Sequence, residues 1–133
     1  IARLPAWFEK DGTGVTAEYS LRKDGLIRVV NTMRVGSLEA KPKAQEGRAY
    51  ALPGQNNAHL RVSFFGPFFG DYVIIELDAD YQWVLLGSPS RKYMWILSRR
   101  PQLDEAKLRE LVAKAQAVGF DTSKLIYTKQ PAE

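Results

Sequence analysis

The chain has 133 residues, of which 45% are hydrophobic and 26% charged, and it predicts one folded domain over residues 1–133. It has no cysteine, which excludes disulfides, a thiolate zinc site and a cysteine nucleophile, and no apolar run long enough for a membrane span. The net charge of +4 comes from scattered basic residues, which indicates a solvated surface or, alternatively, a weak preference for anionic head groups.

The first half of the chain predicts short strands and turns. Residues 1–5 are typical of the second half of a strand, so the chain is expected to begin inside an element. Residues 15–21 alternate between apolar and polar side chains, which favours a strand with one buried face. Asp24-Gly25 predicts a hairpin turn, because this pair readily adopts positive φ. The next expected elements are a strand over 26–35, a loop over 36–45, a strand over 46–52 and a turn over 53–57.

Four more strands are predicted between residues 58 and 101. The apolar runs there are rich in Val, Ile, Leu and aromatic residues, and GPFFG, DAD and GSPS separate them. A single helix follows, with Asp104 as its N-cap, apolar residues at helical spacing up to Val118, and Gly119 as its stop. A last strand is expected over 123–129. Consecutive antiparallel strands of this kind either pack on another layer or close on themselves.

Several segments resemble the bacterial lipocalins. They are SFFGPFFGDY, LDADY and YMWILSRRP in the four-strand region, and VTAEYSL, VVN, EGRAY and GFDTSKL elsewhere, all in the same order. The Gly-x-Trp fingerprint of that family would lie just before Ile1 and is absent. The resemblance implies an all-β fold, an eight-stranded antiparallel up-and-down β-barrel with one C-terminal flanking α-helix and a final short strand.

A barrel of eight strands either holds a small ligand or is filled by its own side chains. Arg99 resembles the lipocalin arginine that closes the narrow end of the barrel, and without its tryptophan we expect it to have no partner. If Arg99 lies inside, strand parity directs Tyr93 and Trp95 inward too. The full set of residues that we predict to bind the ligand is Tyr19, Asn31, Met33, Arg34, Leu60, Val62, Phe64, Tyr93 and Trp95.

This lining is mainly aromatic and aliphatic, with a few polar groups, and it suits an elongated apolar ligand with one polar end. Each buried methylene contributes about 0.8 kcal/mol, so an acyl chain offers on the order of 10 kcal/mol before the costs of association. The resemblance points to a fatty acid or a lysophospholipid as the ligand. We expect no cofactor and no metal.

Four loops are expected at the open end of the barrel, within residues 7–10, 34–45, 65–70 and 88–91. Their cations would receive a carboxylate or phosphate; these are Lys10, Arg34, Lys41, Lys43 and Arg91. We select Arg34 first, because it lies near the mouth end of its strand. Phe68 and Phe69 would contact a membrane surface or a second subunit, and the alternative is that their rings fold back under the rim.

For some inner residues, a place in a packed core remains an alternative to ligand binding. Trp95 facing inward is equally consistent with a packed core and with a ligand wall, and Phe64 belongs as much to the core as to the site. Tyr19 and Asn31 resemble pocket positions of related lipocalins, which favours the ligand interpretation for them. Glu76 is expected to be paired or to face outward within its apolar strand.

No catalytic arrangement is evident. The only histidine, His59, alternates with Leu60 on the outer face, so a Ser-His-Asp triad and a histidine-rich metal site are both disfavoured. A basic barrel that binds single-stranded nucleic acid is a weaker alternative, and its binding would fall steeply with salt. A filled barrel with a purely structural role is a third. We therefore predict a carrier that is not an enzyme and binds no nucleic acid.

The resemblance also implies a location. Bacterial lipocalins of this group are lipoproteins of the outer membrane that face the periplasm, held by a lipidated N-terminal cysteine that would lie upstream of Ile1. Lipid transport or storage in the cell envelope, and homodimer formation, are further expectations that come from the resemblance alone.

Overall fold

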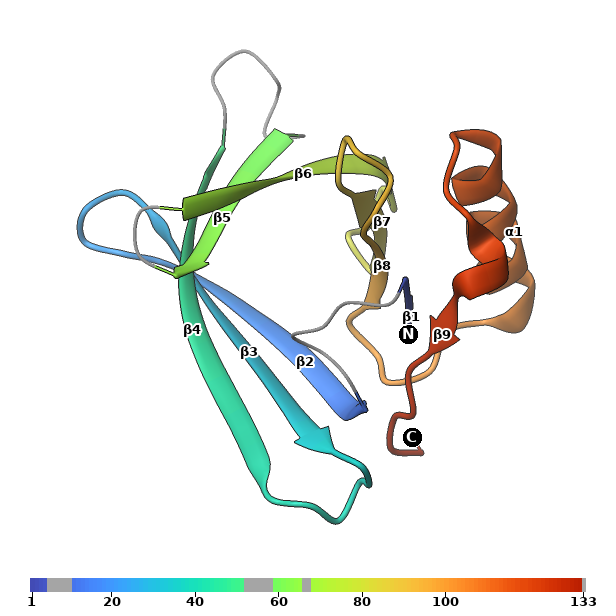
Figure 1. Cartoon of the computed structure of the whole chain (residues 1–133), viewed down its shortest axis with the longest axis horizontal. Helices are drawn as coiled ribbons and strands as arrows, with labels where there is room; N and C mark the ends of the chain where they lie inside the picture. Colours follow the sequence, from blue (N-terminus) through green and yellow to red (C-terminus); the bar gives the residue numbers. More distant parts are fainter. Residues whose placement is uncertain (5–10, 52–58, 66–67, 133) are drawn as a thin grey trace.

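The computed structural model describes residues 1–4, 11–51, 59–65 and 68–132. This part of the chain forms nine strands, one α-helix and one 3-10 helix (Figure 1). The elements are β1 (Ala2–Arg3), β2 (Gly12–Leu21), β3 (Ile27–Val35), β4 (Pro42–Ala51), β5 (His59–Phe65), β6 (Phe68–Leu77), β7 (Trp83–Gly87), β8 (Met94–Ser98), α1 (Glu105–Ala117), η2 (Thr122–Lys124) and β9 (Ile126–Tyr127).

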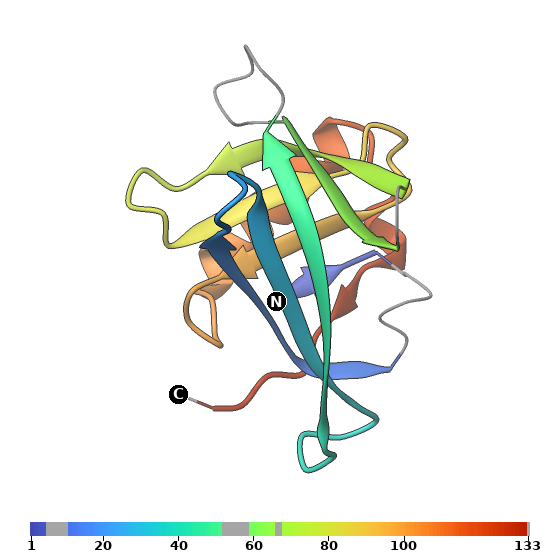
Figure 2. The same cartoon turned by 90° about the vertical axis from the view of Figure 1, so that its left-hand side faces the viewer.

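All nine strands belong to one antiparallel sheet, in the order β2-β3-β4-β5-β6-β7-β8-β1-β9. From β2 to β8, strands that follow one another in the chain are also neighbours in the sheet. The sheet curls until its two ends approach each other (Figures 1 and 2). There the Gly14 amide donates to the carbonyl of Lys129 at 2.7 Å. The up-and-down barrel with a flanking helix and a final strand is thus confirmed.

The turn between β2 and β3 has the predicted chemistry. Gly25 has a φ of 85°, and the Asp24 carboxylate accepts a hydrogen bond from the Leu26 amide at 3.1 Å. The Arg22 amide donates to the Leu26 carbonyl at 2.7 Å and closes the hairpin. Local turn chemistry therefore fixes the register of β2 and β3 at this end.

Several predicted boundaries are wrong, among them that of residues 15–21, whose strand begins at Gly12. The loop predicted over 36–45 ends at residue 41, because β4 begins at Pro42 and pairs with β3 from its first residue onward. Proline lacks an amide hydrogen but is tolerated at the first position of a strand. The strand predicted over 123–129 is only Ile126–Tyr127, since the Asp121 side chain accepts from the Ser123 amide and starts the 3-10 helix η2. The turn predicted over 53–57 lies outside the described residues.

The helix α1 has the predicted cap and stop. Asp104 accepts a hydrogen bond from the Lys107 amide at 3.2 Å, and Gly119 follows the helix with a φ of 104°. Leu111 and Ala115 are its buried residues. They pack on the outside of the barrel against a cluster that includes Leu85, Met94 and Ile96, each with no exposed surface. The main apolar core therefore lies between α1 and the outer face of β7 and β8 (Figure 1).

The turn after β7 is fitted to this core. At Gly87, a Cβ atom would lie 2.5 Å from the Cζ of Phe120, so only glycine allows the ring to pack there. Phe120 is 4% exposed and belongs to the same buried cluster. Among the described residues, no helix has the length and hydropathy needed to cross a membrane.

Candidate ligand-binding site

The inner face of the sheet can be followed through the register of the strands. Trp95 of β8 pairs with Leu86 of β7, and Leu86 pairs with Ile74 of β6. Directly opposed residues of antiparallel strands carry their side chains on the same face. Met94 and Ile96 take the other face, where they pack toward α1. Trp95, Leu86 and Ile74 therefore face the barrel interior.

The same face continues around the barrel. Two residues before Ile74, Tyr72 pairs with Leu60 of β5, and further along Val62 pairs with Ala49 of β4. Ala49 pairs with Ile27 of β3, whose strand then places alternate residues inward as far as Met33. The predicted residues that share this inner face are Tyr19, Asn31, Met33, Leu60, Val62 and Trp95.

A cavity of about 1020 Å³ lies along this face. This volume is at the upper end of the range of small-molecule sites. Its apolar lining consists of Ile1, Val15, Ala17, Leu38, Leu60, Ile74, Leu77, Trp83, Val84, Leu86, Leu97, Pro101 and Pro131. Its larger polar lining residues are Tyr19, Arg34, Tyr81, Gln82, Arg99, Arg100 and Gln130. None of the described lining residues is an aspartate or a glutamate.

Three predicted ligand residues line this cavity: Tyr19, Arg34 and Leu60. Five others, Asn31, Met33, Val62, Tyr93 and Trp95, lie outside its lining, and the side chain of Phe64 lies outside what the structure describes. The prediction missed the wall contributed by β6 and β7, namely Ile74, Leu77, Val84 and Leu86. The parity argument applied to β5 and β8 would also have found Ile74, Val84 and Leu86, had it been extended through the cross-strand pairs.

Tyr19 marks the wall contributed by β2. It lines the cavity, and 54% of its surface is accessible to solvent. At the same time, burial raises the pKa of the Tyr19 phenol. The two observations agree if the accessible surface faces the cavity, where the protein surrounds the phenol without covering it. The ring is then available to a ligand.

Three aromatic residues form a cluster inside the barrel. The Trp95 ring meets Tyr72 edge-on, with centroids 5.2 Å apart, and stacks on Tyr93 at 6.0 Å and 21°. Both geometries are favourable for aromatic pairs. Trp95 and Tyr93 are half-buried. The cluster is therefore a stiff part of the inner wall that still presents some surface to the interior.

The two arginines singled out from the sequence are both engaged. The Arg99 side chain donates from Nε to the carbonyl of Tyr81 at 2.7 Å, so the expectation that Arg99 lacks a partner is wrong. Tyr81 lies in the β6–β7 turn, in the left-handed conformation with a φ of 57°. Arg34 lines the cavity, but its Nη1 donates to the carbonyl of Ala40 and holds the loop after β3.

Arg91 does not serve the mouth of the barrel as predicted. Its guanidinium donates to the carbonyls of Val118 at 3.0 Å and Pro89 at 2.6 Å, and it lies 5.8 Å from the centroid of the Phe120 ring. These contacts point it outward, toward the end of α1. Lys10 lies outside the described residues, as do the side chains of Phe68 and Phe69.

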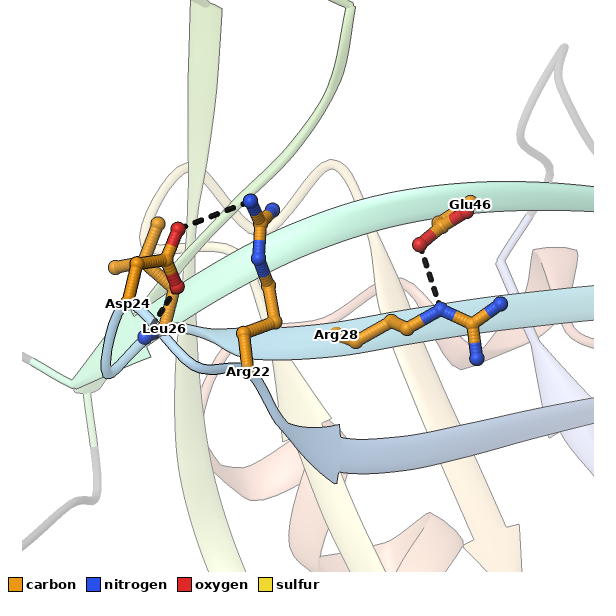
Figure 3. Close-up of polar contacts among 5 residues, drawn as sticks. All are labelled: Arg22, Asp24, Leu26, Arg28 and Glu46. Carbon is orange, nitrogen blue, oxygen red and sulfur yellow. Dashed lines mark hydrogen bonds and ion pairs between the residues drawn. The ribbon is translucent and has the colours of Figure 1, made fainter.

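The outer face of the first strands carries ion pairs. Arg28 of β3 pairs with Glu46 of β4 at 2.6 Å, and Arg22 pairs with Asp24 in the neighbouring turn at 2.9 Å (Figure 3). Exposed pairs of this kind contribute about 0–1 kcal/mol each. They place the carboxylates of Glu46 and Asp24 on the outer face and in the neighbouring turn. Within the described residues, no group of three or more His, Asp or Glu side chains is arranged to hold a metal ion.

A hollow interior with apolar walls, enclosed by a meander of strands and flanked by one helix, is the architecture that the sequence resemblance implies. The Lipocalin-like domain family matches residues 1–130. The chain belongs to the lipocalin family. Lipocalins bind small hydrophobic ligands, and most are carriers.

This lipocalin is similar to bacterial proteins over almost its whole length. It is 42% identical over 133 residues to the outer membrane lipoprotein Blc of Vibrio cholerae, covering 98% of this chain and 76% of that protein. It is 43% identical over 131 residues to the protein of the same name from Escherichia coli K12, covering 98% and 73%. A plant protein, temperature-induced lipocalin-1 of Arabidopsis thaliana, is 42% identical over 139 residues, again covering 98% and 73%.

Solved structures agree on the fold of this lipocalin. Lobster apocrustacyanin A1 superposes with a TM-score of 0.75 at 21% identity, covering 98% of this chain and 74% of that chain. The cockroach allergen Per a 4 superposes with a TM-score of 0.70 at 18% identity, covering 98% and 82%. At these identities the likeness concerns the fold alone.

Proposed function

We propose that this lipocalin binds a fatty acid or a lysophospholipid, with the acyl chain in the barrel cavity, and carries it for lipid transport or storage in the bacterial cell envelope. The observation that carries the proposal is the cavity of about 1020 Å³, whose wall is mostly aliphatic and aromatic. An interior filled by its own side chains would leave no such volume. At about 0.8 kcal/mol per buried methylene, a long chain gains enough free energy there for micromolar or tighter binding.

The charge of the lining supports an anionic amphiphile over a neutral oil. Arg34, Arg99 and Arg100 line the cavity, and the described lining residues include no aspartate or glutamate. A ligand with one acidic group would find complementary charge at the edge of an apolar wall.

The relatives support the proposed location. Those from V. cholerae and E. coli are named outer membrane lipoproteins, and we extend this location to the present chain, on the periplasmic side and with a lipid anchor. In this proposal the protein acts as a carrier and not as an enzyme. Contact of the mouth with a membrane surface and formation of a homodimer stay predictions.

The substitution Ala17→Trp tests the proposal. Ala17 lines the cavity from β2, and an indole at this position would occupy space that the ligand needs. We expect the variant to fold and to lose at least tenfold in affinity for a fatty acid, measured as displacement of an environment-sensitive fatty-acid probe.

Glu18→Trp is the matched control, because Glu18 is the next residue of β2 and pairs with Val30 on the outer face. It adds the same ring outside the barrel and should leave the affinity within twofold. Failure of the unmodified protein to bind the probe at all, or equal affinity of Ala17→Trp and the unmodified protein, would refute the proposal.

A further inference from the structure

Two polar residues of β4 share the inner face with the ligand wall. Lys43 pairs directly with Met33 of β3, and Gln45 pairs with Asn31, which itself pairs with the cavity residue Ala17. Opposed residues of an antiparallel pair have the same orientation, so Lys43, Gln45 and Asn31 all project inward. The prediction of a loop over 36–45 had concealed this, because residues in a loop have no defined face.

Lys43 lies at the end of the barrel where the sequence predicts the mouth. It is the second residue of β4, directly after the loop that follows β3. This hairpin projects beyond its neighbours at one end of the barrel (Figures 1 and 2). An anionic group bound there would remain near water while its chain ran down the wall toward Ala17. That is the arrangement that an amphiphile requires.

The three side chains are available. No hydrogen bond or ion pair joins the side chain of Lys43, Gln45 or Asn31 to any residue in the part of the chain that the structure describes. Asn31 is half-buried, and a half-buried amide that the protein leaves unbonded is satisfied by water or by a ligand. Cations on the outer face differ in this respect, since Arg28 and Arg61 are paired with Glu46 and Asp71.

The carboxylates of these strands lie on the other face. Glu18 and Glu46 both pair with Val30, which places the two acids outside the barrel, and Figure 3 shows Glu46 bonded to Arg28. The inner face of β2, β3 and β4 therefore has a lysine and no acid among its described residues. This separation favours an anion inside the mouth and disfavours a cation there.

We propose that Lys43, together with the side-chain amides of Asn31 and Gln45, receives the carboxylate or phosphate of the bound lipid. Lys43 supplies the charge-assisted hydrogen bond, and the amide pair, one step deeper, donates to the remaining oxygens. Arg34, our first choice from the sequence, also lines the cavity, and its Nη1 donates to the Ala40 carbonyl and holds the adjoining loop. This inference rests on the proposed function, because it assigns the head group of the same ligand.

The test compares three probes on the full chain at low ionic strength: oleate, an oleoyl lysophosphatidic acid and the uncharged oleyl alcohol. For Lys43→Met, which keeps the length of the side chain and removes its charge, we expect a five- to tenfold loss of affinity for the anions. The alcohol should stay within twofold of its affinity for the unmodified protein. Lys43→Arg should restore most of the anion affinity, and added salt should reduce the difference between anion and alcohol.

Lys23→Met is the control for the same change of net charge, since Lys23 is exposed in the β2–β3 turn, away from the mouth. A loss confined to oleate or to the phosphate supports the site and names the head group. Equal affinities of Lys43→Met and the unmodified protein for both anions, or an equal loss for the alcohol, overturn the site. In either of those cases binding itself persists, which separates this failure from a failure of the proposed function.

Discussion

The titration of Tyr19 can indicate whether the cavity of this protein is occupied. The surface of Tyr19 is more than half accessible, yet burial raises the pKa of its phenol, and the two observations agree if the accessible surface faces the cavity. Tyrosine ordinarily titrates near pH 10. Since the folded state holds the phenol neutral, Tyr19 adds stability that is fully present below pH 10 and is lost as the pH rises through its folded-state pKa.

We predict that a ligand moves this titration further. The phenolate absorbance of the unmodified protein minus that of Tyr19→Phe isolates Tyr19, and its midpoint should lie above 10. Oleate should raise the midpoint again, because the chain replaces the water that solvates the phenolate. A midpoint that oleate leaves unchanged would place Tyr19 away from the ligand, and Tyr127→Phe, at an exposed position, serves as the control.

The arginines show what single residues cannot reveal from sequence. Arg99 and Arg91 were both assigned by their expected place in the barrel. However, the partners of both are backbone carbonyls, of Tyr81 for one and of Val118 and Pro89 for the other. A carbonyl acceptor has no identity in the sequence, since every residue has one. Such contacts depend on turn conformations, which only the folded chain defines.

At the scale of elements, the attachment of α1 to the barrel depends on the fit of the Phe120 ring over Gly87 at the end of β7. Phe120 lies over Gly87, and Arg91 covers the same ring while bonding to the end of the helix. Lys107 adds a second point of attachment, with its ammonium 4.9 Å from the centroid of the Trp83 ring. The helix is thus fixed to β7 at both ends.

Gly87→Ala should loosen this attachment. The added methyl group would overlap Phe120, and overpacking of this kind costs about 1–3 kcal/mol, which denaturant unfolding would measure. Gly70→Ala is the control, because a Cβ atom there would meet Tyr72 at 3.7 Å, an ordinary contact. Equal stability of the two variants would contradict the packing described here.

The elements also show where sequence patterns succeed. Alternation predicted β2, β3 and the four strands from β5 to β8, and the cap at Asp104 predicted the start of α1. The start of β4 was missed because Lys43, Ala44 and Gln45 show no apolar alternation. Their strand conformation comes from pairing with β3, and their own β-propensity does not predict it.

At the scale of the whole molecule, few bonds join the two ends of the sheet among the residues that the structure describes. The Gly14 amide donates to Lys129, and the Gln130 side chain donates to the carbonyl of Val15 at 3.0 Å. Gln102 holds the carbonyl of Pro131 at 3.1 Å, and Gln130 and Pro131 also line the cavity. The C-terminal residues thus form part of the wall on the side where the sheet is open.

Removal of the residues after Thr128 should therefore accelerate ligand release. We expect the dissociation rate of a bound fatty-acid probe, measured by stopped flow, to rise several-fold, because the side opening loses both its bridging bonds and two lining residues. Gln102→Ala removes one tail contact without shortening the wall and should have a smaller effect. An unchanged dissociation rate would show that ligands leave by another route.

The placement of the main apolar cluster bears on the working cycle of a carrier. Leu85, Met94, Ile96 and Leu111 are completely covered, and all of them lie outside the lumen, between barrel and helix. The fold is therefore stabilised mainly by contacts outside the barrel, and an empty interior removes none of these contacts. A ligand that entered or left the proposed site would therefore change the hydration of the cavity wall and leave the packing between barrel and helix intact.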